Sequence, residues 1–297
     1  MMTPFTSNKL KSDQPLMQQQ TLKSPIWDID LFEQRQFRNG NTEAQCMECG
    51  QKFETTDAAA MTWHIVQEHP RMEAETKNYK LTYFSSRGIA EPIRLIFHYK
   101  GIPFEDVTFK SFIDDPIRAR EDWLKHKQLY LYGQLPNLEW DEGAEHKALA
   151  QSQTICRYLA NKYGLVGSDF WESAKADEIA EWFKDIWAAF VPFLMVAVGV
   201  EPGEKEVKKR EVFLPLIYDR FVPILVEKLN NSGSGFLLPS GIAWTDFVMA
   251  NALTTFNNIE QGELFKNQKV LADYEKRVYS SNENIKKYVD GRPKKEF

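Results

Sequence analysis

Residues 79–97 read YKLTYFSSRGIAEPIRLIF, a stretch that combines a short apolar strand, a turn containing glycine and the start of a helix. The first six residues favour a strand, and the following residues 91–101 have helical spacing that ends at Gly101. Apolar residues over 102–109 predict a second strand. We therefore expect this region to form a βαβ unit.

The segment that follows predicts a β-hairpin and one more helix. Residues 135–140 and 146–150 are short apolar runs on either side of a turn that contains Gly143, and residues 151–164 have helical spacing with a terminal glycine. Beyond residue 167 strand patterns almost vanish, and helical patterns occupy residues 177–195, 210–229, 244–256 and 270–279. The sequence thus predicts a small α/β domain followed by an all-α domain.

Composition restricts the class of protein. The chain has 297 residues, of which 43% are hydrophobic and 27% charged, which is typical of a globular protein with two or three domains. Its net charge of −5 argues against general binding to nucleic-acid backbones. Three cysteines give no disulfide framework, and the longest apolar run, 187–200, contains Pro192 and is too short for a membrane span. We expect a protein of the cytoplasm or the nucleus with no membrane partner.

Three motifs occur in a fixed order: YKLTYFSSRGIAEPIRLIF, GQLPNLEW at 133–140 and LAQSQTICRYLANKYGL at 149–165. Together they resemble the N-terminal domain of a cytosolic glutathione S-transferase, and they are most similar to the sigma class found in nematodes. The resemblance covers residues 79–297. It implies a thioredoxin-like α/β domain over 79–165, an all-α domain over 166–297, and a homodimer.

By this resemblance Tyr83 stands at the position of the catalytic tyrosine, which stabilises the glutathione thiolate. A free thiol has a pKa of about 8.5, so ionisation at neutral pH needs a drop of about 2 units, or about 2.7 kcal/mol. One hydrogen bond to a charged group supplies about 1.5–3 kcal/mol. Ile89 stands where many sigma-class members have an arginine. Without the surrounding motif, Tyr83 would be one aromatic residue in an alternating strand.

The resemblance also implies which residues bind glutathione. The start of the helix at Gln151 and Ser152 suits the γ-glutamyl carboxylate, because free N–H groups and the helix dipole favour an anion there, although a plain helix cap has the same pattern. Asp185 matches an acidic residue that reaches the neighbouring subunit's glutathione, or it is a solvated helix residue. The full predicted set is Tyr83, Trp123, Lys127, Gly133, Gln134, Leu135, Pro136 (a cis-proline), Gln151, Ser152 and Asp185.

Two further features of the transferase-like region are structural. Cys156 shares a helix face with Ile155 and Leu159, which predicts a core residue and not a nucleophile. The stretch SGIAWTDFVMA resembles the family's buried capping box, with Asp246 kept and Ala243 in place of the hydroxyl residue. Large apolar residues over 182–200 imply an apolar electrophile as the second substrate, or simply a buried helix.

A second motif lies ahead of the transferase-like region. The spacing of Cys46, Cys49, His64 and His69 is typical of a closed tetrahedral set of ligands for structural Zn²⁺. Residues 24–70 resemble a BED-type zinc finger, a small zinc-stapled ββα fold, between a disordered tail at 1–23 and a linker at 71–78. This segment has three basic and eight acidic residues, so we expect it to contact a protein; DNA binding is disfavoured by its acidity.

Two functions follow from these features. The first is a glutathione transferase that conjugates glutathione to apolar electrophiles, with glutathione-dependent isomerisation or peroxide reduction as related activities and zinc as a structural cofactor. The alternative is a non-catalytic regulatory or DNA- or protein-binding zinc-finger protein that uses the transferase fold as a dimerising scaffold. Glutathione-dependent activity of the purified protein separates the two.

Overall fold

The computed structural model describes residues 32–36, 42–46, 52–53, 78–112 and 115–293. The chain divides into two compact units, residues 1–73 and residues 74–297, and each is described by itself. No helix in the described ranges is long and apolar enough to cross a membrane.

The first unit contains a small antiparallel sheet of β1 (Phe32–Gln36), β2 (Thr42–Cys46) and β3 (Lys52–Phe53), in the order β1-β2-β3. The zinc-finger hypothesis needs two strands and a helix, and the described residues supply three strands. The tail at 1–23, most of the linker, and Cys49, His64 and His69 lie outside the described residues. Cys46 ends β2, and the zinc site stays a prediction.

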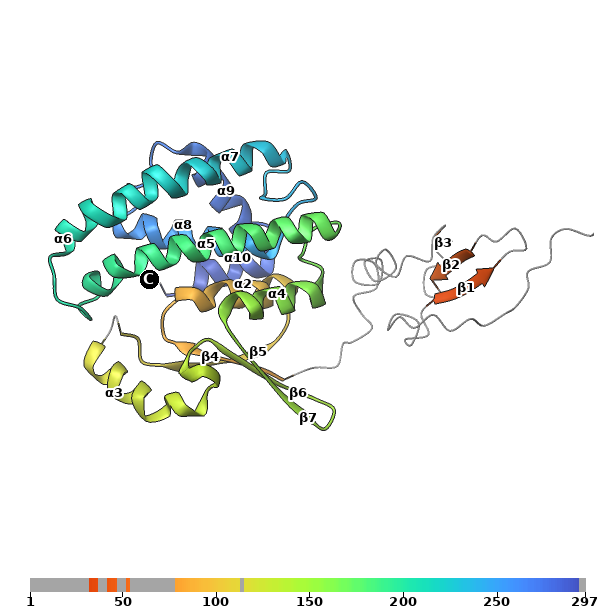
Figure 1. The fold of residues 1–297 in the computed structure, drawn as a ribbon, viewed down its shortest axis with the longest axis horizontal. Coiled ribbons are helices and arrows are strands. Elements are labelled where there is room, and N and C mark those ends of the chain that lie inside the picture. Colours follow the sequence, from red (N-terminus) through yellow and green to blue (C-terminus); the bar gives the residue numbers. More distant parts are fainter. Residues whose placement is uncertain (1–31, 37–41, 47–51, 54–77, 113–114, 294–297) are drawn as a thin grey trace, which may run out of the picture. The chain divides into compact units, whose positions relative to one another are not determined.

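The second unit begins with a four-stranded sheet in the order β5-β4-β6-β7 (Figure 1). Its strands are β4 (Tyr79–Phe84), β5 (Phe104–Phe109), β6 (Asn137–Glu142) and β7 (Glu145–Ala150). The strands β4 and β5 are parallel and joined by a helix, whereas β6 is antiparallel to both β4 and β7. The predicted βαβ unit and hairpin are confirmed.

Helices α2 (Glu91–Lys100), α3 (Pro116–His126) and α4 (Ser152–Tyr163) belong to the same part of the chain. The helix α2 follows a 3-10 turn, Gly88–Ala90, and ends at Gly101 in the left-handed conformation. Asp115 caps α3 by accepting the N–H of Arg118 at 3.0 Å. The sequence pattern does not predict α3, because only Ala119 of that helix is buried.

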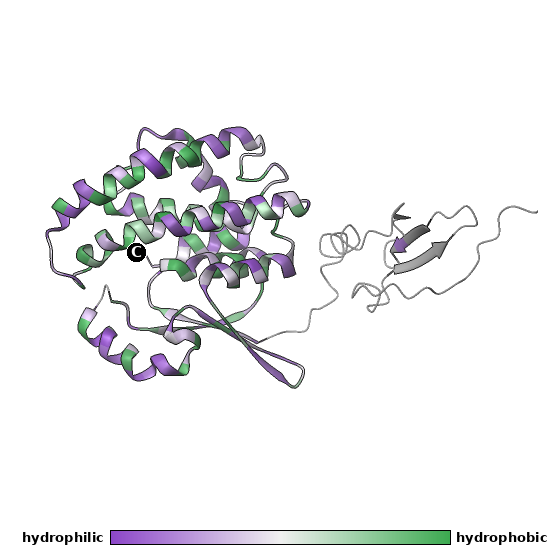
Figure 2. Cartoon of the chain, viewed as in Figure 1, coloured by the Kyte–Doolittle hydropathy of each residue, from purple (hydrophilic) through white to green (hydrophobic). Residues whose placement is uncertain are grey.

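The rest of the second unit is helical, as predicted. It contains α5 (Phe170–Ala197), α6 (Lys205–Lys208), two π-helical segments, α7 (Val222–Ser232), α8 (Trp244–Ile259), α9 (Lys269–Tyr279) and α10 (Glu283–Gly291). Pro192 lies inside α5, which continues past it. Figure 2 shows hydrophilic and hydrophobic residues alternating along these helices. The core includes the fully buried Trp244, Phe247 and Phe256 of α8.

Two expected structural features are present. Cys156 is buried, and burial raises the pKa of its thiol, so it is a core residue. At the start of α8, Asp246 accepts hydrogen bonds from the N–H groups of Ala243 (2.7 Å) and Leu237 (3.0 Å) and from the hydroxyl of Tyr274 (2.9 Å). The carboxylate half of the capping box is therefore formed, while alanine offers no hydroxyl for the other half.

Candidate active site

A cavity of about 400 Å³ gathers most of the residues predicted to bind glutathione. Six predicted residues line it, from three separate segments: Trp123, Gly133, Gln134, Leu135, Gln151 and Ser152. Phe84, Ile89 and Phe112 complete the lining. Segments that the sequence separates by up to 68 residues thus meet at one site, between the end of β4 and the start of α4.

The polar side of the cavity is formed at the start of α4. Gln151 has φ 74° and ψ 112°, a left-handed backbone that is uncommon for a residue other than glycine. Its side-chain amide donates a hydrogen bond to Oε1 of Gln134 at 2.9 Å. Strained backbone of this kind is often retained at binding sites. The side chain of Gln151 makes no cap hydrogen bond, so it does not compete for the N–H groups at the first turn of α4, and a helix start of this kind suits an anion.

Aromatic side chains form a second part of the cavity lining. The ring of Trp123 lies 5.7 Å from that of Phe84 and 5.8 Å from that of Tyr130, and Phe84 packs edge-on against Phe112 at 5.0 Å. Neither Phe84 nor Phe112 was predicted to line the site. Phe84 lies inside the first family motif, directly after Tyr83, but the resemblance gave it no role, and Phe112 lies outside the three motifs.

Three further predicted residues, Lys127, Pro136 and Asp185, are not among those that line the cavity. The Leu135–Pro136 peptide bond is cis, as the resemblance implied, and Pro136 is buried. Lys127 is exposed and packs close to Gly133, where an added Cβ would lie 3.0 Å from its side chain. Asp185 is exposed on α5, and its role toward a neighbouring subunit stays a prediction.

Tyr83 borders the cavity through Ile89. Its hydroxyl accepts the N–H of Ile89 at 3.4 Å, and Ile89 lines the cavity. The approach depends on Gly88, whose φ is +45° and where a Cβ would lie 2.6 Å from the Tyr83 hydroxyl oxygen. Burial raises the pKa of the Tyr83 hydroxyl, and the N–H of Ile89 and the charge of Arg94 oppose that rise. The phenol is therefore protonated at neutral pH and keeps a proton to donate.

A positive charge reaches Tyr83 from a position that the sequence analysis did not name. Ile89 occupies the place expected for an arginine, but the guanidinium carbon of Arg94 lies 6.0 Å from the centre of the Tyr83 ring. Arg94 is held by ion pairs with Glu91 (3.3 Å) and Asp106 (2.8 Å). The signal was the spacing of Glu91 and Arg94 on one face of α2.

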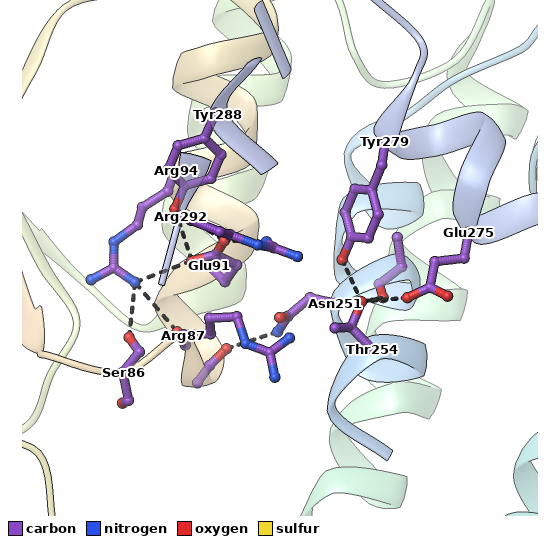
Figure 3. Close-up of polar contacts among 12 residues, drawn as sticks. Ser86, Arg87, Glu91, Arg94, Asn251, Thr254, Glu275, Tyr279, Tyr288 and Arg292 are labelled. Atoms are coloured by element: carbon purple, nitrogen blue, oxygen red, sulfur yellow. Dashed lines mark hydrogen bonds and ion pairs between the residues drawn. The ribbon is translucent and has the colours of Figure 1, made fainter. Parts of the chain in front are cut away.

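A larger cavity, of about 900 Å³, lies between α2, β5 and α10. No residue of the predicted set is among those of the described chain that line it. Its arginines Arg94 and Arg292 are paired with Glu91, which is buried and also accepts the hydroxyl of Tyr288 at 3.0 Å (Figure 3). The smaller cavity is therefore the candidate active site, because six predicted residues line it and Tyr83 borders it through Ile89.

Comparison with known proteins identifies the family. Residues 79–161 match the glutathione S-transferase N-terminal domain, and residues 184–292 match the glutathione S-transferase C-terminal domain. Glutathione S-transferase 1 of Ascaris suum is 38% identical over 216 residues, which cover 73% of this chain and 97% of the relative. This chain belongs to the glutathione S-transferase family.

Solved structures of transferases have the same fold. A structure titled a nu-class transferase from Haemonchus contortus is 33% identical with a TM-score of 0.62, and covers 74% of this chain and 100% of that one. A structure titled monomeric Na-GST-3, from Necator americanus, is 34% identical with a TM-score of 0.64 and the same coverage. The predicted thioredoxin-like domain, helical domain and transferase identity are confirmed.

Proposed function

We propose that this transferase conjugates the thiolate of glutathione to apolar electrophiles at the 400 Å³ cavity. The observation that carries the proposal is the protonated hydroxyl of Tyr83 beside a cavity lined by six of the residues expected to bind glutathione. The hydroxyl donates a hydrogen bond to the sulfur, which favours the thiolate over the thiol. The proton lost by the thiol goes to solvent.

The reaction follows from that thiolate. Its sulfur attacks the electrophilic carbon, a C–S bond forms, and the leaving group departs with its electron pair or, in an addition, the electrons move onto the acceptor. The same thiolate serves glutathione-dependent isomerisation, or reduction of a peroxide in which sulfur is oxidised. The apolar content of α5 supports an apolar electrophile, since its residues Trp187, Leu194 and Met195 are only partly buried.

Different groups of the site suit different parts of glutathione. The first turn of α4 suits the γ-glutamyl carboxylate, and the backbone of Gln134 and Leu135 suits the cysteinyl part. Trp123 and Lys127 suit the glycine end of glutathione, because the exposed ammonium group of Lys127 can pair with its carboxylate. The assignment to the sigma class rests on the sequence motifs and belongs to this proposal.

The homodimer is also part of the proposal. Leu129, Leu131 and Tyr132, which directly precede the cavity residue Gly133 in the chain, are exposed apolar side chains, and Tyr132 is 77% exposed. Exposed apolar patches of this kind mark protein interfaces. A neighbouring subunit is also what the role of Asp185 requires.

Purified full-length protein tests the activity. We expect it to bind immobilised glutathione and to conjugate glutathione to an activated aryl chloride. The function is rejected if the protein binds no glutathione and gives no product with an aryl chloride, an isothiocyanate or an organic peroxide.

Zinc at Cys46, Cys49, His64 and His69 is the second part of the proposal. We propose one structural Zn²⁺ per chain, in a finger that docks a protein partner in cytoplasm or nucleus. Metal analysis of the full chain is expected to give one zinc, and Cys49→Ser is expected to remove it without loss of glutathione binding. Purified protein without zinc would contradict the zinc site. Sequence-selective binding of duplex DNA in a gel-shift experiment would contradict the assignment of a protein partner.

A further inference from the structure

The geometry points to Asn251, on α8 of the helical domain, as a positioning residue for Tyr83. Its side-chain amide holds the peptide group whose N–H contacts the tyrosine hydroxyl. The inference rests on the proposed function and adds to it a residue outside the cavity, because Asn251 is not among the residues that line it.

The contact runs through a single peptide unit. The amide Nδ2 of Asn251 donates to the carbonyl oxygen of Gly88 at 2.9 Å, and the N–H of the same Gly88–Ile89 peptide donates to the Tyr83 hydroxyl at 3.4 Å. Figure 3 shows Asn251 extending from its helix toward the segment that carries Arg87. The two residues joined by the first hydrogen bond are 163 positions apart in the chain.

Planarity makes this arrangement directional. The C=O and N–H of a trans peptide point in opposite directions, so fixing the carbonyl oxygen of Gly88 also fixes the direction of the Ile89 N–H. Gly88 has φ +45°, and glycine has little intrinsic preference between left- and right-handed backbone. An external hydrogen bond is therefore needed to hold this peptide in one orientation.

The hydrogen bonds also reinforce one another. A carbonyl that accepts a hydrogen bond polarises its peptide, which makes the N–H of that peptide a stronger donor. A tyrosine oxygen that accepts the N–H becomes a stronger donor through its own proton. In the proposed complex the last acceptor in this chain of hydrogen bonds is the glutathione thiolate. Asn251 thereby affects the sulfur through Tyr83.

Asn251 places a buried amide in the interior of α8. Its side chain is 4% exposed, and its Oδ1 has no hydrogen-bond partner in the part of the chain that the structure describes. A buried amide with an unpaired oxygen is costly, and a leucine of similar volume would suit the interior of α8. The amide is explained by the one hydrogen bond that it donates.

The test compares Asn251→Leu with Thr255→Val in the full-length protein. Thr255 is a buried polar residue one turn further along α8, and 1% of it is exposed, so its variant reports general effects on this helix. For each protein the pKa of bound glutathione is measured from thiolate ultraviolet absorbance and from the pH dependence of kcat/KM. We expect Asn251→Leu to raise the thiol pKa and to lower kcat/KM below that pKa about threefold to tenfold. Thr255→Val is expected to leave both unchanged.

A double variant shows whether Asn251 acts through the tyrosine. In the Tyr83→Phe background, Asn251→Leu is expected to have no further effect on the thiol pKa. The inference is overturned if Asn251→Leu leaves the thiol pKa unchanged, if Thr255→Val changes it equally, or if the effects of Asn251→Leu and Tyr83→Phe simply add. If the wild type itself neither binds nor ionises glutathione, the proposed function fails instead.

Discussion

The guanidinium group of Arg94 lies beside the ring of Tyr83, with 6.0 Å between the guanidinium carbon and the ring centre. Arg94 cannot move freely, because Glu91 and Asp106 hold it and its Nη1 also donates to the carbonyl of Ser86 at 3.0 Å. Its charge favours negative charge near the phenol, and burial opposes that effect. The result is a phenol that keeps its proton and is well placed to share it.

Tyr83→Phe removes the hydrogen bond to the thiolate and leaves the ring. We expect kcat/KM to fall about 10- to 100-fold near neutral pH, because a hydrogen bond to a charged group contributes about 1.5–3 kcal/mol. The pKa of bound glutathione should rise toward the value of the free thiol. Tyr218→Phe, which loses a hydroxyl bonded to the carbonyl of Leu264 at 3.3 Å, is the control with unchanged kcat/KM. Equal activity of Tyr83→Phe and wild type would contradict the assignment.

Gly88→Ala places a methyl group where the Tyr83 hydroxyl lies. The added Cβ would be 2.6 Å from the hydroxyl oxygen, so the tyrosine must shift. We expect kcat/KM to fall at least about tenfold while the Kd for glutathione changes little, since the start of α4 is untouched. Gly143→Ala has φ +61° and no neighbour within 4 Å of its Cβ, so it reproduces the backbone strain alone. An equal fall of kcat/KM in Gly88→Ala and Gly143→Ala would contradict the role of the contact with Tyr83, because it would show that an alanine at a positive φ suffices to lower activity.

Glu91→Gln tests the buried cluster between α2 and α10. Glu91 is 1% exposed and neutralises Arg94 and Arg292, so its loss leaves buried positive charge. We expect the free energy of unfolding in urea to fall by about 3 kcal/mol. Glu263→Gln breaks an exposed ion pair with Lys266 and should cost less than about 0.5 kcal/mol. A loss for Glu91→Gln no larger than that of the control would show that the cluster adds nothing to stability.

His98 makes stability depend on pH. Its ring stacks on Tyr288 of α10 at 3.9 Å, and burial lowers its pKa below the ordinary value, against the opposing charges of Glu91 and Asp106. Below about pH 6.5 the unfolded state binds a proton that the folded state resists, so stability is lost as pH falls through that value. His98→Phe keeps the stacking and cannot titrate.

The measurement is the free energy of unfolding of wild type and His98→Phe at about pH 7.5 and about pH 5.5. Taking the difference between the two proteins removes contributions they share, such as Asp246, whose pKa burial raises to about 7 and which therefore acts with the opposite sign. We expect the difference to shift in favour of the variant at the lower pH. A constant difference would refute the prediction.

Tyr132→Ser tests the dimer. The side chain is 77% exposed on a backbone with φ 59°, so a serine there should not disturb the monomer's core. We expect sedimentation to show a dimer for wild type and a larger dissociation constant for the variant, because aromatic anchors dominate interfaces. Ile117→Ser, at a 72% exposed position on α3, is the control with unchanged association. A monomeric wild type would contradict the dimer itself.

The sequence predicted the elements of the first domain in two ways. The strand β4 and the helix α4 were found because several of their residues are buried and the spacing shows it. The strand β5, which buries none of its residues, and the hairpin were found from short runs bounded by turn residues such as Gly101 and Gly143. The helices α3 and α10 were missed, and each buries a single residue, Ala119 and Ile285 respectively. A short helix that buries one residue leaves little trace of burial in the sequence.

The site residues were predictable only where they lie inside sequence motifs. Residues inside contiguous motifs, such as Gln134 and Ser152, were predicted and do meet at one cavity. Asn251 and the charge of Arg94 were not, since their effect depends on contacts that form only in the folded chain. The zinc ligands are untested, because three of the four lie outside the described residues.

The hydrogen bond from Asn251 to Gly88 has a consequence for recombination between transferases. The two residues come from different halves of the fold, so a chimera that joins the first half of one enzyme to the helical half of another separates the two partners of this hydrogen bond. Such a hybrid is expected to fold and to bind glutathione, yet to ionise it poorly. Libraries built by exchanging domains should therefore carry positions 88 and 251 as a linked pair.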